Sequence, residues 1–220
     1  MEIITKYETG DNLFFTSDTH FYHANIIKFC DRPFKDTTEM NEGLIKNWNS
    51  VVGPTDIIYH LGDFCFAGSA EWHYLLSKLN GRIHLILGNH DEKNIRQGYI
   101  QHLESVSYQA KLLVEGYNVY LNHYPYLCYP GYKPYTFQLF GHIHSSPYKF
   151  EGLDAKVAKS QLQPSQYDVG VDWNNFTPIS FREVLEKIKY QKEHNVNMYE
   201  NSMRMDSYSD SSNRGSCSSK

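Results

Sequence analysis

Five short clusters of polar residues along this 220-residue chain carry side chains that can bind metal ions or move protons. The clusters are Asp18-Thr19-His20, Gly62-Asp63, Gly88-Asn89-His90-Asp91, Asn122-His123 and Gly141-His142-Ile143-His144. In a turn, a D-x-H or H-x-H spacing lets two side chains reach the same side, and the glycines let the backbone bend sharply beside a ligand. These residue types predict a metal site with a nearby group that transfers a proton.

The number of candidate ligands indicates more than one metal ion. Apart from His90, the clusters supply two carboxylates, four imidazoles and one amide oxygen, from Asp18, Asp63, His20, His123, His142, His144 and Asn89. This set is too large for one tetrahedral zinc and suits two metals that share a carboxylate. Nitrogen and oxygen ligands without a thiolate favour Mn, Fe, Zn or Ni over Ca.

Predicted strands lead into the clusters and would bring them to one edge of a sheet. Mostly apolar runs at Asn12–Ser17, Asp56–Leu61 and Arg82–Leu87 end at the first three clusters, and helices are expected to begin near Asp36 and Ser69. Strands that alternate with helices predict an α/β fold with a largely parallel sheet. Open α/β sheets place their sites at the carboxyl ends of the strands.

The second half of the chain predicts further strands and a closing helix. We expect an irregular loop over Phe21–Arg32, strands at Ser105–Val114, Tyr117–Leu121, Thr136–Phe140 and Tyr167–Val171, and a helix over Pro178–Gln191 with Phe181, Val184, Leu185 and Ile188 buried. Residues 1–200 are expected to form one domain. Residues 201–220 are expected to be disordered, because they are rich in serine and almost free of apolar side chains.

Composition excludes several classes of protein. A formal charge of −4 gives no electrostatic reason to coat a nucleic-acid backbone, although a local nucleic-acid site stays open. The four cysteines are scattered without a C-x-x-C pair, the first ten residues do not resemble a signal peptide, and no apolar run reaches the ~20 residues of a membrane helix. We therefore expect a cytoplasmic protein with reduced cysteines and no membrane partner; the sequence indicates no oligomeric state.

The ordered clusters resemble the calcineurin-like metallophosphoesterase superfamily. Its pattern of D-x-H, G-D, G-N-H-D/E, a lone H and G-H-x-H is complete here between Leu13 and His144. Four segments are similar to the small single-domain bacterial and phage enzymes, namely Ser17-Asp18-Thr19-His20-Phe21, Arg32-Pro33-Phe34, His60-Leu61-Gly62-Asp63-Phe64 and His123-Tyr124-Pro125. The resemblance implies two packed mixed β-sheets flanked by helices, an α/β/β/α sandwich with its site at the strand ends.

The resemblance also implies a role for each cluster. Asp18, His20 and His144 would hold a first divalent metal, Asn89, His123 and His142 a second, and Asp63 would bridge the two, with Mn²⁺ the favoured ion. Two such cations supply hydroxide from a bridging water near neutral pH and bind phosphate oxygens. His90 would face the substrate as general acid or phosphate binder.

Four other features allow two interpretations each. His23 and Arg32 could contact the substrate phosphate, or they could stabilise their own loop through a salt bridge or hydrogen bond. Asp91 is expected to support the cluster or its turn rather than bind metal. Asp172 could orient a ligand histidine or cap the turn before the last helix, and the cap is favoured. The loop Tyr126–Pro134 could stack a base or only pack, and packing is favoured.

The leading functional hypothesis is a dimetal phosphodiesterase that acts on a small phosphoester or a nucleotide. The complete ligand set comes with little extra positive charge to hold a dianionic monoester, and Gly62–Gly68 lacks the second acid and arginine of the G-D-x-x-D-R-G motif in the family's protein phosphatases. The alternatives are a nuclease or nucleic-acid end-processing enzyme, a phosphomonoesterase, and a metal-stabilised interaction module without catalysis.

Overall fold

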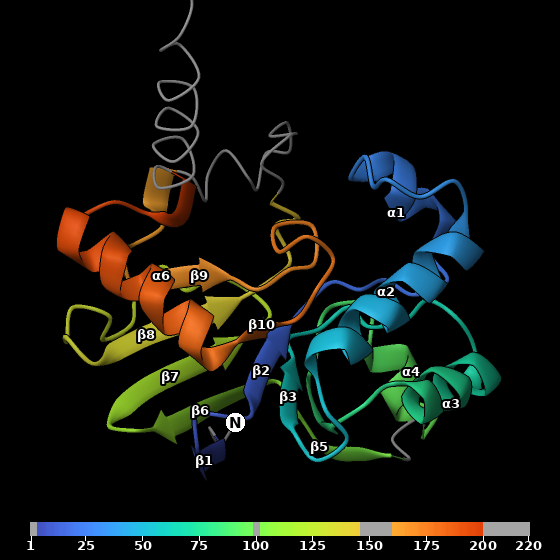
Figure 1. Ribbon diagram of the computed structural model, residues 1–220, viewed down its shortest axis with the longest axis horizontal. Coiled ribbons are helices and arrows are strands. Elements are labelled where there is room, and N and C mark those ends of the chain that lie inside the picture. Colours follow the sequence, from blue (N-terminus) through green and yellow to red (C-terminus); the bar gives the residue numbers. More distant parts are fainter. Residues whose placement is uncertain (1–3, 99–101, 146–159, 200–220) are drawn as a thin grey trace, which may run out of the picture.

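Two five-stranded β-sheets pack against each other, and helices cover their outer faces (Figure 1). The computed structural model describes residues 4–98, 102–145 and 160–199. Sheet A has the strand order β1 (Ile4–Glu8), β6 (Gln109–Val114), β7 (Tyr117–Asn122), β8 (Thr136–Phe140) and β9 (Gln166–Asp168). Sheet B has the order β10 (Ile179–Ser180), β2 (Leu13–Thr16), β3 (Ile57–His60), β4 (Arg82–Ile86) and β5 (Leu103–Ser107). This is the expected sandwich.

Strands β2, β3, β4 and β5 run parallel, and the short β10 pairs antiparallel with β2. In sheet A, β6 and β7 form the antiparallel pair, while β1 joins β6, and β8 and β9 follow β7, in parallel. An isolated parallel bridge joins Ser17, just after β2, to Gly170, just after β9. The carboxyl ends of strands from both sheets therefore meet at one edge of the sandwich.

The central strands β2, β3 and β4 of sheet B are buried on both faces, which explains their nearly continuous apolar sequence. In β2, Leu13 and Phe15 belong to the core between the sheets, whereas Phe14 packs in the cluster on the helix side. In β3, Tyr59 belongs to the core between the sheets and Ile58 to the cluster on the helix side. Side chains alternate across a strand, so adjacent apolar residues supply both cores.

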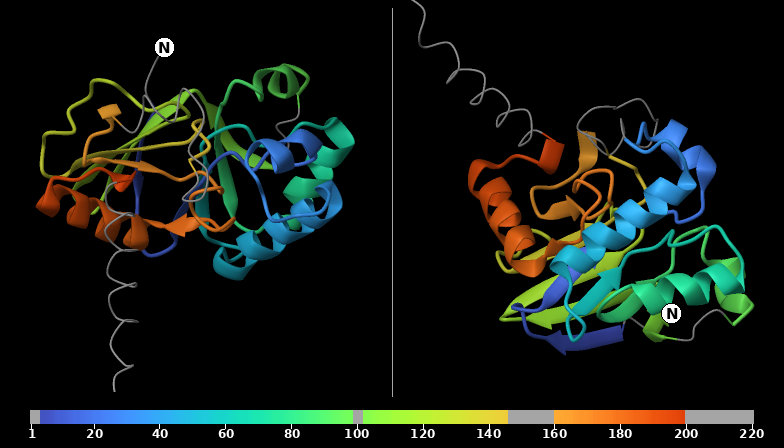
Figure 2. Two further views of the ribbon diagram at one scale, coloured as in Figure 1. Left: turned by 90° about the horizontal axis from the view of Figure 1, so that it is seen from above. Right: turned by 45° about the vertical axis from the view of Figure 1, so that its right-hand side comes forward.

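The helices lie in two groups, as the views in Figure 2 show. The helices α1 (Ala24–Phe29), α2 (Thr37–Val51), α3 (Ser69–Lys78) and α4 (Glu92–Arg96) lie beside sheet B, and α6 (Phe181–His194) lies beside sheet A. In α2, Asp36 accepts the N-cap hydrogen bond from the Glu39 amide, and Ser180 with Glu183 forms a capping box at α6. The four apolar residues expected on the inner face of α6 are all buried. No helix in these described ranges is long and apolar enough to span a membrane.

Two local predictions were wrong, and one strand was not predicted. The segment predicted as an irregular loop contains the helix α1, and the N-terminal strand β1 was not predicted. The single strand predicted over Ser105–Val114 is two strands, β5 and β6, that belong to different sheets. The error over Ser105–Val114 and the missed strand have one cause, since pairing with distant strands decides where β1, β5 and β6 lie. The predicted tail over 201–220 lies outside the described residues.

Candidate metal centre

The seven predicted ligands come together at the strand ends as two groups. Their members are Asp18, His20 and His144 in the first group, and Asp63, His123 and His142 in the second. Within each group the ligand atoms lie within 4.8 Å of one another. Asn89 joins the second group, because its Oδ1 lies 3.2 Å from His123 Nε2. The structure thus brings together residues from both sheets and from five different turns.

Asp63 lies between the two groups. Its Oδ2 is 3.6 Å from His20 Nε2 in the first group and 3.6 Å from His123 Nε2 in the second. Its Oδ1 accepts a hydrogen bond of 3.0 Å from the His90 amide. One carboxylate therefore faces both clusters of nitrogen and oxygen atoms, which is the placement that a bridging ligand needs.

The backbone at these turns adopts unusual conformations. Asp18, His20, Asp63, His142 and His144 all have positive φ angles between 45° and 72°. A non-glycine residue in this left-handed region costs roughly 1–2 kcal/mol, and such strain concentrates at functional sites. Five of the seven candidate ligands carry it, so the surrounding fold holds these side chains in directions that a relaxed chain would not favour.

Two glycines make the close packing of the turns possible. A Cβ atom at Gly88 would overlap the carboxylate of Asp63, and a Cβ at Gly141 would overlap Ser17 and Asp18. Gly141 also places the next amide, that of His142, 2.9 Å from Asp18 Oδ2. The glycines of the G-N-H-D and G-H-x-H clusters therefore let one turn pack directly against the ligand of another.

Neighbouring acceptors fix which nitrogen of two histidines is available. His123 Nδ1 lies 2.7 Å from the Leu61 carbonyl oxygen, and His144 Nδ1 lies 3.0 Å from Asp172 Oδ2. Each contact requires a proton on Nδ1, so Nε2 is the atom of each ring that can bind a metal. Burial disfavours charge on His144, but its hydrogen bond to Asp172 outweighs this and raises the pKa, so a metal would replace a proton on its Nε2. This pairing of a ligand histidine with a second acceptor is typical of metal sites.

The electrostatics of the centre favour bound cations. Burial, and then the charge of Asp18, raises the pKa of Asp63 to about 7. Burial and the neighbouring His144 hold the pKa of His20 well below its usual range, so His20 is neutral. Asp18 Oδ1 is buried and has no hydrogen-bond partner among the described residues. Two carboxylates that repel each other, an orphaned oxygen and the neutral imidazole of His20 together fit divalent metal ions.

Sequence and structure comparisons agree with this geometry. A family model for calcineurin-like phosphoesterases matches residues 12–199, which include all seven candidate ligands. The chain belongs to the calcineurin-like phosphoesterase family. It is therefore a metal-dependent phosphoester hydrolase, since this family is dimetal-dependent and the two ligand groups are present.

Several relatives of this calcineurin-like phosphoesterase match it over most of its length. The uncharacterized protein MJ1445 of Methanocaldococcus jannaschii is 35% identical over 82% of this chain and 93% of its own. The Gene 66 protein of Mycobacterium phage D29 is 30% identical over 81% of this chain and 98% of its own. A crystal structure of AQ665, a protein of unknown function from Aquifex aeolicus, has a TM-score of 0.58 and 29% identity over 79% of this chain and 97% of its own.

Arg32 is fully occupied by contacts inside the protein. Its guanidinium donates to both carboxylate oxygens of Asp172, at 2.8 and 2.9 Å, and to the carbonyls of Asp18 and Thr19, at 2.7 and 2.9 Å. The side chain is fully buried. Of the two interpretations offered for Arg32, this geometry supports loop stabilisation by a salt bridge rather than a contact with substrate.

The favoured prediction for Asp172 was wrong. Its carboxylate does not cap the turn before α6 but joins Arg32 to His144 Nδ1. Burial disfavours charge on Asp172, but Arg32 and His144 outweigh it and lower the pKa of the carboxyl group. Asp172 thus orients a candidate ligand, the alternative that the sequence left open. Asp172 is far from both Arg32 and His144 in sequence, so no local pattern shows these contacts.

Asp91 supports the site as expected. Its buried carboxylate accepts hydrogen bonds from the amides of Asp63, Phe64 and Gly88, at 2.7 to 2.9 Å. Three backbone donors hold the turns of the second and third clusters together. The side chain therefore shapes the site without facing the candidate metals.

His90 stands at the open side of the centre. Its side chain is 46% exposed, and Nε2 lies 4.0 Å from Asp63 Oδ2. Burial of the remainder lowers the pKa of His90. The ring of Phe66 lies 4.6 Å from that of His90 and stacks on His23 at 4.0 Å, with an angle of 5° between the planes. His23 is thus held by an aromatic neighbour that the sequence pattern did not reveal.

A third group of possible ligands shares a residue with the first. Cys30, His144 and Asp172 also have ligand atoms within 4.8 Å of one another. Both oxygens of Asp172 already accept hydrogen bonds from Arg32, whose positive charge opposes a cation at this position. We therefore assign Asp172 to the support of His144, which leaves the other two groups as the candidate metal sites.

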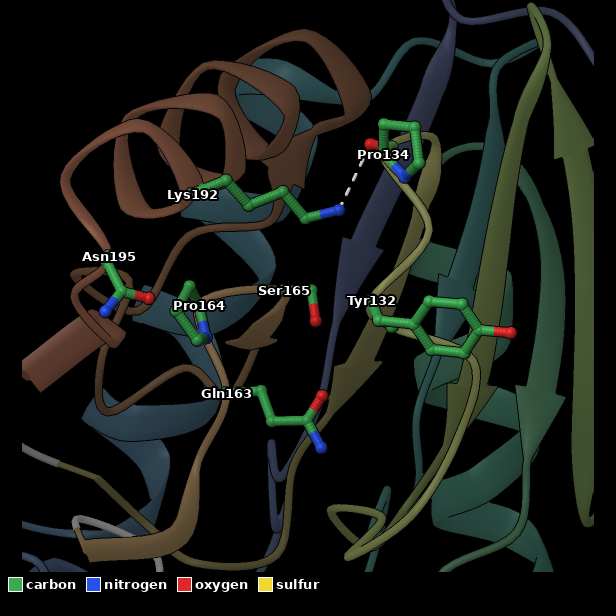
Figure 3. Close-up of a pocket in the computed structure, with 8 residues that line it drawn as sticks. Tyr132, Pro134, Gln163, Pro164, Ser165, Lys192 and Asn195 are labelled. Carbon is green, nitrogen blue, oxygen red and sulfur yellow. Dashed lines mark hydrogen bonds between the residues drawn. The ribbon is translucent and has the colours of Figure 1, made fainter.

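The Tyr126–Pro134 loop packs against sheet A, as favoured. The Tyr126 amide donates to Gln138 Oε1 at 2.9 Å, and the Tyr129 hydroxyl donates to the Ser165 carbonyl at 2.7 Å. The loop also borders a pocket of about 330 Å³, where the Lys192 side chain points toward Pro134 and the Tyr132 ring points away from Lys192 (Figure 3). Lys192 donates to three backbone carbonyls there, including that of Pro134, so it stabilises the loop.

Proposed function

We propose that this phosphoester hydrolase is a phosphodiesterase that uses two divalent cations. The observation that carries the proposal is the position of Asp63, whose Oδ2 is equally far from a histidine of each ligand group. Asp18, His20 and His144 would hold one cation and Asn89, His123 and His142 the other, with Asp63 shared. Bound at these positions, the cations would activate water as the nucleophile and offset negative charge on the phosphate.

The chain's own residues contribute the remaining steps. Asp172 and the Leu61 carbonyl keep the Nδ1 protons of His144 and His123 in place, so that the opposite nitrogens stay available. His90 is placed at the open side, where it can donate a hydrogen bond or a proton to the leaving oxygen. The Asp91 carboxylate holds the turns that carry Asp63 and Asn89.

The charges beside the centre support a diester over a monoester substrate. A dianionic monoester needs more positive charge than a monoanionic diester. Arg32, the arginine considered for phosphate binding, is buried and paired with Asp172. The arginine of the protein-phosphatase motif is absent from Gly62–Gly68.

The donor atoms support Mn²⁺ as the working ion, with Fe, Zn or Ni as alternatives. Both groups offer imidazole nitrogens and carboxylate oxygens, and the second adds the amide oxygen of Asn89. Mixed ligands of this kind suit first-row transition metals better than Ca²⁺.

Turnover of two chromogenic esters tests the proposal. With Mn²⁺ added, the protein should hydrolyse bis-p-nitrophenyl phosphate faster than p-nitrophenyl phosphate. Asp63→Asn should lower kcat at least 10³-fold, whereas the matched control His84→Asn, in a buried histidine outside the centre, should retain activity within about threefold. Equal rates for wild type and Asp63→Asn would refute the mechanism, and a preference for the monoester would reverse the choice of substrate.

A nuclease or end-processing activity is the second candidate. Two aromatic side chains beside the centre, Phe66 and Tyr124, are 37% and 44% exposed, and exposed rings can stack on bases. The Tyr124 hydroxyl also lies 3.3 Å from Asn89 Oδ1. Binding of short oligonucleotides that weakens steeply with salt would favour this candidate.

A further inference from the structure

A pocket of about 540 Å³ opens beside His90. One wall is the loop between β3 and α3, including Phe66, and the other is α4 with Lys93, followed by Gln97. Asn89 and His90 line it as well, so the pocket is continuous with the candidate metal centre. Its volume falls within the ~300–1,000 Å³ typical of small-molecule sites.

The lining charge is positive. Lys93 provides an ammonium group, and none of the described residues that line the pocket is a carboxylate. The neighbouring Glu92 is engaged elsewhere, by Arg96 at 3.0 Å and by the Tyr108 hydroxyl at 3.1 Å. A ligand at the α4 wall therefore meets the cation of Lys93, while the carboxylate of Glu71 lies beside Gly68 on the opposite wall.

The opposite wall suits an aromatic ring. His23 covers one side of the Phe66 ring, while 37% of Phe66 remains exposed. Beside it, burial raises the pKa of the Cys65 thiol to about 12, so this part of the wall is uncharged. Aromatic side chains of this kind stack on nucleobases with little sequence preference.

We propose that this pocket holds the leaving group of the phosphodiester, and that Lys93 selects leaving groups with a second negative charge. A leaving group that combines an aromatic ring with a further phosphate is a nucleotide. The inference rests on the proposed function, because His90 can face the leaving oxygen only if the metals occupy the two ligand groups. It adds a specificity determinant outside the metal centre.

Three dinucleotides test the role of Lys93. They are TpT and its two extended forms, pTpT and TpTp. The additional phosphate is on the leaving nucleotide in pTpT if the 3′ oxygen leaves, and in TpTp if the 5′ oxygen leaves. The form with this phosphate on the leaving nucleotide should have a KM about 5- to 10-fold below that of TpT, the range expected for one charged contact at a partly exposed site. Lys93→Gln should abolish this difference, and 0.5 M salt should reduce it in the wild type.

Arg96→Gln is the matched control, because it removes the same charge from the same helix outside the pocket. Equal effects of Lys93→Gln and Arg96→Gln, or no preference for either extended form, would overturn the proposal. Removing the base from the leaving nucleotide should raise KM about fivefold or more, since stacking on Phe66 would be lost. An unchanged KM would refute the aromatic part of the proposal.

A binding measurement separates this proposal from the proposed function. If the wild type hydrolyses neither bis-p-nitrophenyl phosphate nor TpT, the phosphodiesterase proposal fails. Equilibrium dialysis of the Mn²⁺-loaded protein with thymidine 3′,5′-bisphosphate and with thymidine then tests the pocket alone. Tighter binding of the bisphosphate that Lys93→Gln weakens and Arg96→Gln does not would support the pocket; binding that is equal in both variants would reject it.

Discussion

Asp172→Asn tests whether one buried carboxylate supports both the fold and the metal centre. The side chains of Asp172 and Arg32 are 2% and 0% exposed and make two hydrogen bonds. Removing one partner of a buried ion pair costs roughly 3–5 kcal/mol, because the other charge is left without compensation. Asparagine keeps one oxygen that can accept from Arg32, so we expect the free energy of unfolding to fall by about 3 kcal/mol.

The same substitution should weaken metal binding. His144 Nδ1 donates to Asp172 Oδ2 at 3.0 Å, and loss of such a partner typically lowers metal affinity 10- to 100-fold. Chemical denaturation in EDTA measures the stability of the metal-free protein. Titration of Mn²⁺ against a competing chelator measures affinity in the folded protein.

A double variant separates the two effects. Arg32→Gln combined with Asp172→Asn removes both buried charges, so part of the lost stability should return. Metal affinity should remain low, because His144 still lacks its partner. A loss of less than about 1 kcal/mol in Asp172→Asn, together with an unchanged affinity for Mn²⁺, would refute this account of the Asp172 side chain.

Two further substitutions test single features of the structure. Burial lowers the pKa of His60 from 6.5 to about 3, so the unfolded chain binds more protons below pH 6.5, and the stability that His60 contributes is lost as pH falls from 6.5 toward 3. His60→Gln should therefore reduce the loss in unfolding free energy between pH 7 and pH 5 by about 2 kcal/mol, as measured by denaturation at both values. Gly88→Ala should displace Asp63 and lower kcat for bis-p-nitrophenyl phosphate by at least 10-fold, since a Cβ there would overlap its carboxylate.

His60→Gln is compared with the wild type, and Gly88→Ala with a second glycine variant. Identical pH dependence in the wild type and His60→Gln would show that this histidine is not the buried neutral group described above. Gly98→Ala is the control for Gly88→Ala. No atom of the described residues lies within 4 Å of a Cβ added at Gly98, and the φ of +83° at Gly98 predicts a cost of about 1 kcal/mol without loss of activity. Equal activity in the two glycine variants would contradict the packing argument.

The sequence by itself determined the ligand types, their order and their place after the strands. Side chains such as Asp18 and His20 lie two residues apart, and the apolar run that precedes them is a local signal for a buried strand. The same is true of the inner face of α6, where Phe181, Val184 and Ile188 follow helical spacing. Short-range periodicity encodes these features, so they could be predicted without coordinates.

Only the tertiary structure decided how Arg32, Asp172 and Lys93 are used. Arg32 and Asp172 are 140 residues apart in sequence, and no local pattern distinguishes an arginine that binds an aspartate from one that binds a phosphate. Lys93 acquires its proposed role only because α4 lies opposite Phe66 across a pocket. The division of β5 and β6 between two sheets was likewise set by pairing with distant strands. Long-range contacts of this kind depend on which surfaces meet when the two sheets pack together.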